Sequence, residues 1–321
     1  MADVTIIGAG VAGLCAAYAA CKAGLTPRLI DRAGVPGPHG CSWWAGGMLA
    51  PQCEGAVAEP AIVAHGQRAA AFWQAITPVA HQGSLVLALD RDRGELERFA
   101  RRTCDHQRIT DIAALEPDLA SHRAALFFKN EAHLDPRAAL SDLVAALNAR
   151  GVEIERSEVA PEAITGPVID ARGFSARLPG LRGVRGEMVV LRTRDIALSR
   201  PVRLLHPRHP LYIVPRPGGV FMLGATQIES TDKRGVSARA VLELLSAAYA
   251  LDPRFAEAEL LETGADLRPA YADNVPRVTI RGNVMHLNGL FRHGYLMAPA
   301  LAAQAVDYLT TGRKGDLVYE D

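Results

Sequence analysis

Short apolar runs and glycines alternate near the start of the chain in an order that predicts a strand, a helix and a second strand. Residues 4–7 read VTII, a β-rich apolar run suited to a buried central strand. Residues 11–23 are rich in Ala and Leu and predict a helix, which Gly24 would end. Residues 25–30 predict the second strand, which leads to Asp31. We expect the rest of the chain to be organised around this unit.

Later apolar runs predict further helices and strands in mixed order. Asp135 and Ser237 are expected to cap two of the helices, and Pro136 suits a first helical position. The helices are predicted over residues 61–76, 95–103, 136–150, 238–250 and 300–309. The strands are predicted over residues 83–89, 124–128, 152–155, 167–171, 186–192, 212–226 (a hairpin), 259–267 and, as the closing strand, 284–287.

Three glycines at the first strand–helix junction form the pattern G-x-G-x-x-G. Gly8 permits a tight turn, Gly10 lets the backbone approach a pyrophosphate, and Gly13 lets the helix pack closely on the strand. Asp31 is placed to accept hydrogen bonds from a ribose 2′-OH. An acid there fits FAD or NAD and disfavours NADP, whose 2′-phosphate it would repel. The pattern therefore predicts a dinucleotide-binding site.

A signal peptide or membrane span is the alternative interpretation of this stretch, because residues 4–21 carry no charge. Its three glycines, its strand-like start and the lack of a preceding basic region argue against it. The strand order instead predicts an α/β fold with α+β insertions: a Rossmann-type dinucleotide domain and a smaller β-rich substrate domain. The first domain is assigned to residues 1–78, 134–183 and 262–321, and the second to residues 79–133 and 184–261.

The composition argues against nucleic-acid binding, membrane-surface binding and a metal site. The 321 residues contain 35 Lys and Arg and 35 Asp and Glu, so the formal net charge is zero. A partner such as nucleic acid or a membrane surface would need a basic surplus. The five cysteines are odd in number and form no C-x-x-C, which favours a reduced, cytoplasmic protein. The ten histidines lack ligand spacing, so no metal site is expected.

Two adjacent tryptophans, Trp43 and Trp44, precede Ala45, Gly46 and Gly47. We expect the rings to lie in the core, and the small residues to press their backbone against a large flat ligand. A hydrophobic surface loop capped by a glycine turn is the alternative. The position after the ribose-binding strand favours the ligand, since the chain can run back beneath a flavin ring.

At residues 43–51 (WWAGGMLAP) the sequence resembles the D-amino-acid oxidase (DAO) superfamily of flavoproteins. More closely, it resembles the FAD-dependent glycine oxidases of thiazole (thiamine) synthesis, the ThiO type. Four further passages agree, in family order over nearly the whole chain: LYIVPR at 211–216, GAT at 224–226, LRP at 267–269 and NGLFRHGYLMAP at 288–299. The resemblance implies an FAD-binding domain of the glutathione-reductase and DAO kind.

The resemblance also implies roles for individual side chains. Arg268 would pair with the substrate carboxylate, Tyr212 would lie beside it, and Arg292 would border the same pocket near the flavin. A planar guanidinium suits a carboxylate, and Arg268 precedes Pro269 at a strand end, which favours this role over a surface charge. Tyr212 suits the hairpin core equally well. The glycines around Arg292 are also typical of a turn, and His293 of a satisfied buried histidine.

The expected site is summarised by two sets of residues. FAD is expected to contact Gly8, Gly10, Val11, Ala12, Gly13, Asp31, Arg32, Ser42, Trp43, Ala45, Gly46, Gly47, Met48, Gly173, Arg292, His293, Gly294, Tyr295 and Leu296. The substrate pocket is expected to contain Met48, Tyr212, Gln227, Arg268 and Arg292, with Arg268, Tyr212 and Arg292 as the catalytic set.

Two departures from the family pattern bear on the cofactor and the substrate. Several relatives attach FAD covalently through a His just before the small residues of the second motif or a Cys near the C-terminus. Here Trp44 takes the first place and no Cys follows Cys104, so FAD is expected to be non-covalent. Glycine oxidases often have Met after the GAT segment, whereas this chain has Gln227, and the preferred amine stays open.

The activity implied by the resemblance is oxidation of glycine with O2 and water to glyoxylate, ammonia and hydrogen peroxide. The substrate's α-hydrogen would pass as hydride to flavin N5, and the protein would exclude water and fix the carboxylate without a general base. The N-terminus of the helix expected at residue 300 would complement charge on the reduced ring. Two alternatives stay open: a dehydrogenase of sarcosine or D-amino acids that uses a quinone or protein acceptor, and a flavin-binding protein without turnover. A homo-oligomer is compatible with the sequence.

Overall fold

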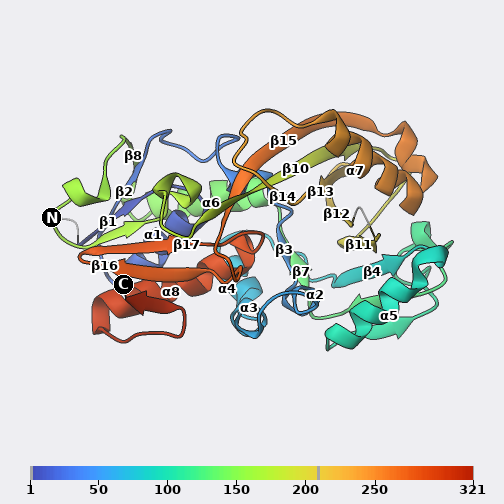
Figure 1. Cartoon of the computed structure of the whole chain (residues 1–321), viewed down its shortest axis with the longest axis horizontal. Helices are drawn as coiled ribbons and strands as arrows, with labels where there is room; N and C mark the ends of the chain where they lie inside the picture. Colours follow the sequence, from blue (N-terminus) through green and yellow to red (C-terminus); the bar gives the residue numbers. More distant parts are fainter. Residues whose placement is uncertain (1–2, 208–209, 321) are drawn as a thin grey trace.

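The computed structural model describes residues 3–207 and 210–320, and two large sheets lie at opposite ends of its elongated shape (Figure 1). The first sheet has seven strands and is mostly parallel, and the second has nine and is mostly antiparallel. A short ribbon of β3 (Met48–Leu49) and β7 (Ala132–His133) lies between them. This arrangement confirms the predicted α/β class with a β-rich part.

The first sheet has the strand order β18-β16-β17-β9-β1-β2-β8. Its strands are β1 (Val4–Ile7), β2 (Pro27–Asp31), β8 (Ile154–Arg156), β9 (Val168–Asp170), β16 (Arg277–Arg281), β17 (Val284–Asn288) and β18 (Val318–Glu320). β1 pairs in parallel with β2 on one side and with β9 on the other. The chain therefore reverses its direction of winding beside β1, and ligands of such sheets bind at the carboxyl ends of these strands.

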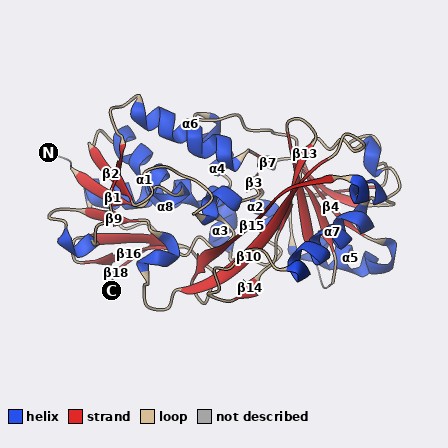
Figure 2. Cartoon of the chain, turned by 90° about the horizontal axis from the view of Figure 1, so that it is seen from above, coloured by secondary structure: helices blue, strands red, loops and turns tan. Residues whose placement is uncertain are grey.

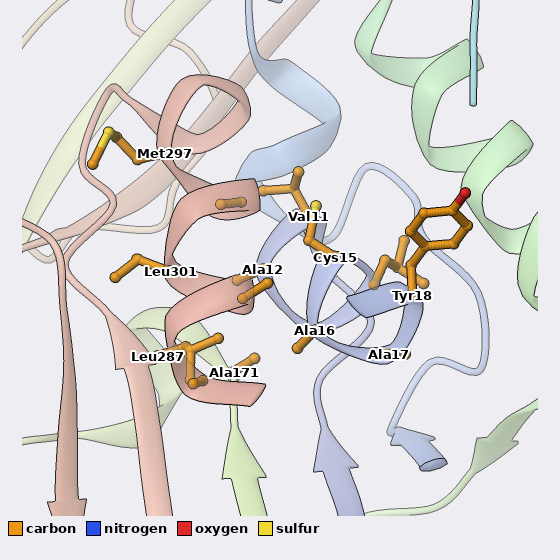
Figure 3. Close-up of a cluster of buried hydrophobic side chains, with 14 of the residues drawn as sticks. Val11, Ala12, Cys15, Ala16, Ala17, Tyr18, Ala171, Leu287, Met297 and Leu301 are labelled. Carbon is orange, nitrogen blue, oxygen red and sulfur yellow. The ribbon is translucent and has the colours of Figure 1, made fainter. Parts of the chain in front are cut away.

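Two helices pack on the first sheet, and a third packs on one of them. α1 (Val11–Lys22) and α8 (Gly294–Thr311) contact the sheet and each other, and α6 (Pro136–Asn148) contacts α1. Figure 3 shows the interface, where Ala12 and Leu301 belong to one buried apolar cluster. The predicted cap of α6 is confirmed, because the carboxylate of Asp135 accepts hydrogen bonds from the first backbone N–H groups of the helix.

The second sheet has the order β14-β10-β13-β12-β11-β4-β6-β5, with β15 also paired to β10. Its shorter strands are β4 (Ser84–Ala88), β5 (Gln107–Ile109), β6 (Ala125–Phe128), β11 (Val202–Leu205), β12 (Leu211–Arg216), β13 (Val220–Gly224) and β14 (Ile228–Glu229). Helices α5 (Arg93–Arg102) and α7 (Ala238–Leu251) pack on this sheet. The predicted hairpin of β12 and β13 is confirmed, with Gly218 and Gly219 at its turn.

Two long strands, β10 (Arg182–Arg192) and β15 (Glu259–Ala270), pair with each other and reach from the second sheet toward the first (Figures 1 and 2). The domain boundaries predicted at 183/184 and 261/262 fall within these strands. The two ends of the molecule are thus connected by continuous β-structure.

Two predicted helices differ from the observed ones. The helix expected over residues 61–76 is divided into α3 (Pro60–Gly66) and α4 (Ala69–Gln74), preceded by the short α2 (Pro51–Glu54). α3 ends at Gly66, which packs so tightly on Leu296 of α8 that a Cβ would lie 2.8 Å from its Cγ. This contact is tertiary and has no local sequence signal.

The last helix, α8, begins at Gly294 rather than at residue 300, so Pro299 lies inside it. The missing N–H of Pro299 leaves the carbonyl of Tyr295 without its helical partner. The indole N–H of buried Trp73 donates to this carbonyl at 2.8 Å. A tertiary hydrogen bond thus replaces the lost one and lets the helix run through the proline.

Some short strands were not predicted, among them β11, β16 and β18. The strand expected to close the sheet, β17, is therefore followed by another after α8. Within the described residues, no helix combines the length and the apolar character needed to cross a bilayer.

Candidate functional site

A cavity of about 850 Å³ lies at the carboxyl ends of β1 and β2 and extends to the second sheet. Its lining includes Gly8 and Gly10 after β1, Tyr212 on β12 and Arg268 on β15. The predicted dinucleotide loop and the predicted substrate residues therefore open onto one continuous space.

Glycine is needed for a different structural reason at each of the three positions of the first loop. Gly8 has a φ of 105°, and a Cβ there would lie 2.7 Å from the carbonyl oxygen of Ala171. A Cβ on Gly13 would overlap the carbonyl oxygen of Gly8. Gly10 has only Ser42 Oγ near its added Cβ, at 3.3 Å, and it lines the cavity. The chain itself thus requires Gly8 and Gly13, whereas the bare backbone at Gly10 is open to a ligand.

Asp31 holds the glycine turn against the end of β2. Its Oδ2 accepts a hydrogen bond from the N–H of Ala9 at 2.9 Å, and its Oδ1 accepts one from Ala33 at 2.7 Å. The side chain also lines the cavity, and its carboxylate oxygens can accept further hydrogen bonds. Contact with a ribose stays a prediction, and the structure adds this second, structural function.

The small residues 45–47 follow a constrained path along the cavity. Gly47 has a φ of 74°, and an added Cβ would overlap the carbonyl oxygen of Leu134. The carbonyl of Gly46 accepts a hydrogen bond from Nη2 of Arg216 at 2.7 Å. Because the backbone of this segment is fixed and bare, it can approach a flat ligand closely.

Trp43 and Trp44 are partly buried: each packs against a buried apolar cluster, as expected, and each also lines the cavity. The guanidinium carbon of Arg137 lies 4.7 Å from the ring centroid of Trp43 and 5.3 Å from that of Trp44. The indole N–H of Trp44 donates to the carbonyl of Pro38 at 2.9 Å. Contacts with a cation and a loop carbonyl hold both rings at the edge of the core.

Arg268 lies within β15, two residues before its end at Ala270, rather than at the strand end as predicted. Its Nη2 donates to the carbonyl of Thr226 at 2.5 Å. Among the described residues, none of the groups that act on its charge is a carboxylate. Burial lowers the pKa of Arg268 from its ordinary value. The cavity therefore contains a guanidinium group whose charge is not compensated.

Tyr212 lies beside Arg268, on the cavity side of β12, where its ring is held between two glycines. A Cβ on Gly46 would lie 2.9 Å from Cε2 of the ring, and one on Gly224 would overlap the hydroxyl. Burial raises the pKa of Tyr212, so the phenol stays protonated at neutral pH. Tyr212 is thus a neutral donor next to an uncompensated cation.

Arg292 lines the cavity but is paired with Glu54, a residue that sequence analysis did not select. Glu54 is the last residue of α2 and is 7% exposed. Its Oε2 lies 2.8 Å from Nη2 of Arg292, and its Oε1 lies 2.5 Å from Nη2 of Arg203. Although burial opposes it, the two guanidinium groups lower the pKa of Glu54 well below its usual range. No sequence motif connects these three residues, which come from separate elements.

His293 is buried beside this ion-pair cluster, with Nδ1 3.5 Å from Oε2 of Glu54. Burial, together with the charges of Arg292 and Arg203, lowers the pKa of His293 to about 4 despite the nearby carboxylate. Nδ1 has no hydrogen-bond partner within the described part of the chain. A neutral imidazole is therefore expected at the cavity wall.

The structure brings the predicted residues together with one exception. Gly13 does not line the cavity and instead packs under Gly8. Gln227 lines the cavity but is exposed to solvent. Every other residue of the two predicted sets is part of the cavity lining. Direct contact of these residues with a cofactor or substrate stays a prediction.

The residues present fit FAD. The N-terminus of α1 directs its positive dipole end to the cavity beside the bare backbone of Gly10. β2 ends at the acid Asp31, which suits a ribose, and the glycine-rich wall at residues 45–47 suits a flat ring. Residues 8–12, Asp31 and residues 45–48 would hold the cofactor.

Comparison with known proteins identifies relatives over nearly the whole chain. The family model DAO, described as FAD dependent oxidoreductase, matches residues 3–308. A Rhizobium etli protein named as the thiamine biosynthesis oxidoreductase ThiO is 51% identical over 316 residues, which cover 96% of each chain. A Pseudomonas aeruginosa protein named glycine oxidase is 27% identical, with 97% of this chain and 95% of that protein covered.

The fold is also similar to solved structures. The crystal structure of glycine oxidase from Geobacillus kaustophilus superposes with a TM-score of 0.84 at 23% identity. The superposition covers 98% of this chain and 96% of the other. At this identity the similarity concerns the fold.

Proposed function

The chain belongs to the DAO family of FAD dependent oxidoreductases, and from this premise we propose that it oxidises glycine. The products would be glyoxylate, ammonia and hydrogen peroxide, with O2 as the electron acceptor. Similarity to the Rhizobium etli ThiO protein supports a place for this reaction in thiamine synthesis.

The observation that carries the proposal is the uncompensated guanidinium of Arg268 beside the neutral phenol of Tyr212. A planar guanidinium in a partly dry cavity binds a carboxylate through two parallel hydrogen bonds and so orients it. The phenol hydroxyl can donate a further hydrogen bond to the same group. The pair therefore suits a small amino acid bound by its carboxylate.

Bound FAD would supply the acceptor for a hydride from the substrate's α-carbon. The chain's own residues then have three tasks. Arg268 fixes the carboxylate, the walls at Tyr212 and Met48 exclude water, and the N-terminus of α8 at Gly294 complements negative charge in the cavity. No side chain needs to remove a proton from carbon.

We also propose that residues 1–78, 134–183 and 262–321 form the FAD-binding part and that residues 79–133 and 184–261 form the substrate-binding part. The two sheets support this division, although β10 and β15 run across its boundaries. A reducing, cytoplasmic location is supported by five free cysteines, of which Cys15 and Cys53 are buried.

The test is product analysis with purified holoprotein, glycine and air. One glyoxylate, one ammonia and one hydrogen peroxide per glycine would support the proposal. Flavin that is reduced by glycine but stays reduced in air would contradict the oxidase and identify a dehydrogenase. A flavin that no amino acid reduces would contradict enzyme activity of this kind.

A further inference from the structure

Two of the three guanidinium groups at the substrate end of the cavity share one carboxylate. Glu54 lies between Arg203 and Arg292 and forms an ion pair with each. Arg268 has no carboxylate among the groups that act on it within the described residues. Its guanidinium group is therefore the one that is left to pair with the carboxylate of a ligand.

The cluster still has the means to bind an anion. Arg203, Arg292 and Glu54 all line the cavity. Among the described residues, Nε of Arg203 and Nε of Arg292 are buried and lack a hydrogen-bond partner. Arg203 is placed directly opposite Tyr212 in the pairing of β11 with β12, so both side chains lie on the same face of the sheet. Both guanidinium groups therefore lie near the position proposed for the substrate, and each has one buried N–H without a partner among the described residues.

Resting on the proposed function, we propose that Glu54 is a specificity-determining residue. Its carboxylate occupies the guanidinium groups of both Arg203 and Arg292 and so restricts the pocket to amino acids with a single carboxylate. Without this charge, the two guanidinium groups form a second carboxylate site, and the pocket takes dicarboxylic amines such as iminodiacetate. Glu54 excludes dicarboxylic ligands in two ways: it repels their second carboxylate, and it occupies the guanidinium groups that could bind that carboxylate.

The test measures ligand binding to the holoprotein by the change in flavin absorbance, with acetate as the monocarboxylate and malonate as the dicarboxylate. The wild-type protein should bind acetate more tightly than malonate. Glu54→Gln keeps the shape of the side chain and removes its charge. It should tighten malonate binding relative to acetate by about 10-fold or more. Removing a like charge next to a bound anion changes the affinity for that anion by at least this factor.

Two further variants separate charge from shape. Glu54→Asp keeps the charge and shortens the side chain, so it should keep the wild-type preference for acetate. The double variant Glu54→Gln/Arg203→Met removes one charge of each sign and should return the preference toward acetate. If the effect came from packing alone, Glu54→Asp would disturb selectivity more than Glu54→Gln.

The proposal is overturned if wild-type protein binds malonate as tightly as acetate, a result that needs no variant. It is also overturned if Glu54→Gln holds flavin but leaves the ratio unchanged. Turnover gives a second readout, because Glu54→Gln should gain activity on iminodiacetate relative to glycine. Failure of the proposed function looks different: glycine would not reduce the flavin, while the binding ratios would still report on Glu54.

Discussion

The guanidinium group of Arg268 occupies the space that a side chain on Gly186 would take. An added Cβ would overlap Nη2 and lie 2.5 Å from Cζ. Gly186 faces Asp266 across the pairing of β10 with β15, two residues from Arg268 on the same strand. Absence of a side chain at Gly186 is therefore what lets the guanidinium lie in the cavity.

Gly186→Ala should displace Arg268 and raise KM for glycine by about 10-fold or more, because a loss of 1.4 kcal/mol in binding is a factor of ten. The bound flavin should keep its absorbance spectrum. Gly235→Ala is the matched control, since a Cβ at that position meets no atom within 4 Å. Equal kinetic constants for Gly186→Ala and the wild type would mean that Arg268 does not hold the substrate.

The glycine loop predicts a contrast between two Gly→Ala variants. At Gly10 the added Cβ meets only Ser42 Oγ, so Gly10→Ala should fold but lose most of its FAD. At Gly13 the Cβ overlaps the backbone of Gly8, so Gly13→Ala should lower the free energy of unfolding as well. Circular dichroism melts and flavin content separate the two effects. Full flavin occupancy in Gly10→Ala would argue against pyrophosphate binding there.

The mode of cofactor attachment is open to a simple assay. No cysteine follows Cys104, and Trp44 stands where some relatives carry a linking histidine. Acid precipitation should therefore leave a colourless pellet and release FAD into the supernatant. A chromophore that stays with the pellet would show a covalent link.

Two buried histidines predict a loss of stability in weak acid. Burial lowers the pKa of His293 and of His133 to about 4, whereas an unfolded histidine titrates near pH 6.5. Between these values the unfolded chain binds more protons, so the free energy of unfolding should fall as the pH decreases from 6.5 to 4. Each histidine can contribute up to roughly 3 kcal/mol.

Urea unfolding of the wild type and of His293→Asn at pH 7 and pH 5 measures the contribution of His293. The loss in free energy of unfolding between the two pH values is compared for the two proteins. The wild type should lose more stability than the variant over this interval. If both lose the same amount, His293 does not stay neutral in the folded protein.

The sequence predicted those features of the fold that depend on a few neighbouring residues. The glycine loop, the cap at Asp135 and the Gly218-Gly219 hairpin all have residue types that only a few backbone conformations accept. The position of Arg268 in the cavity followed from a family pattern. These features are observed where the sequence indicated them, within a few residues.

Tertiary partners explain what the sequence did not predict. The start of α8 depends on the hydrogen bond from Trp73 to the carbonyl of Tyr295, two residues more than 200 positions apart. The role of Glu54 depends on its ion pairs with Arg203, which lies on β11, and Arg292, which lies in the loop before α8. Neither relationship has a spacing that a single sequence can show.

We propose that Arg268 holds the carboxylate of an amino acid that reduces the bound flavin. Anaerobic titration with glycine, followed by flavin absorbance, tests this role. Wild-type protein should bleach, and Arg268→Ala should retain FAD while its kcat/KM falls by about 30- to 4000-fold, the loss expected for roughly 2–5 kcal/mol of buried ion pairing. The variant should also lose its preference for glycine over a simple alkylamine. Equal loss on both amines, or unimpaired bleaching by glycine, would show that Arg268 does not hold the substrate carboxylate.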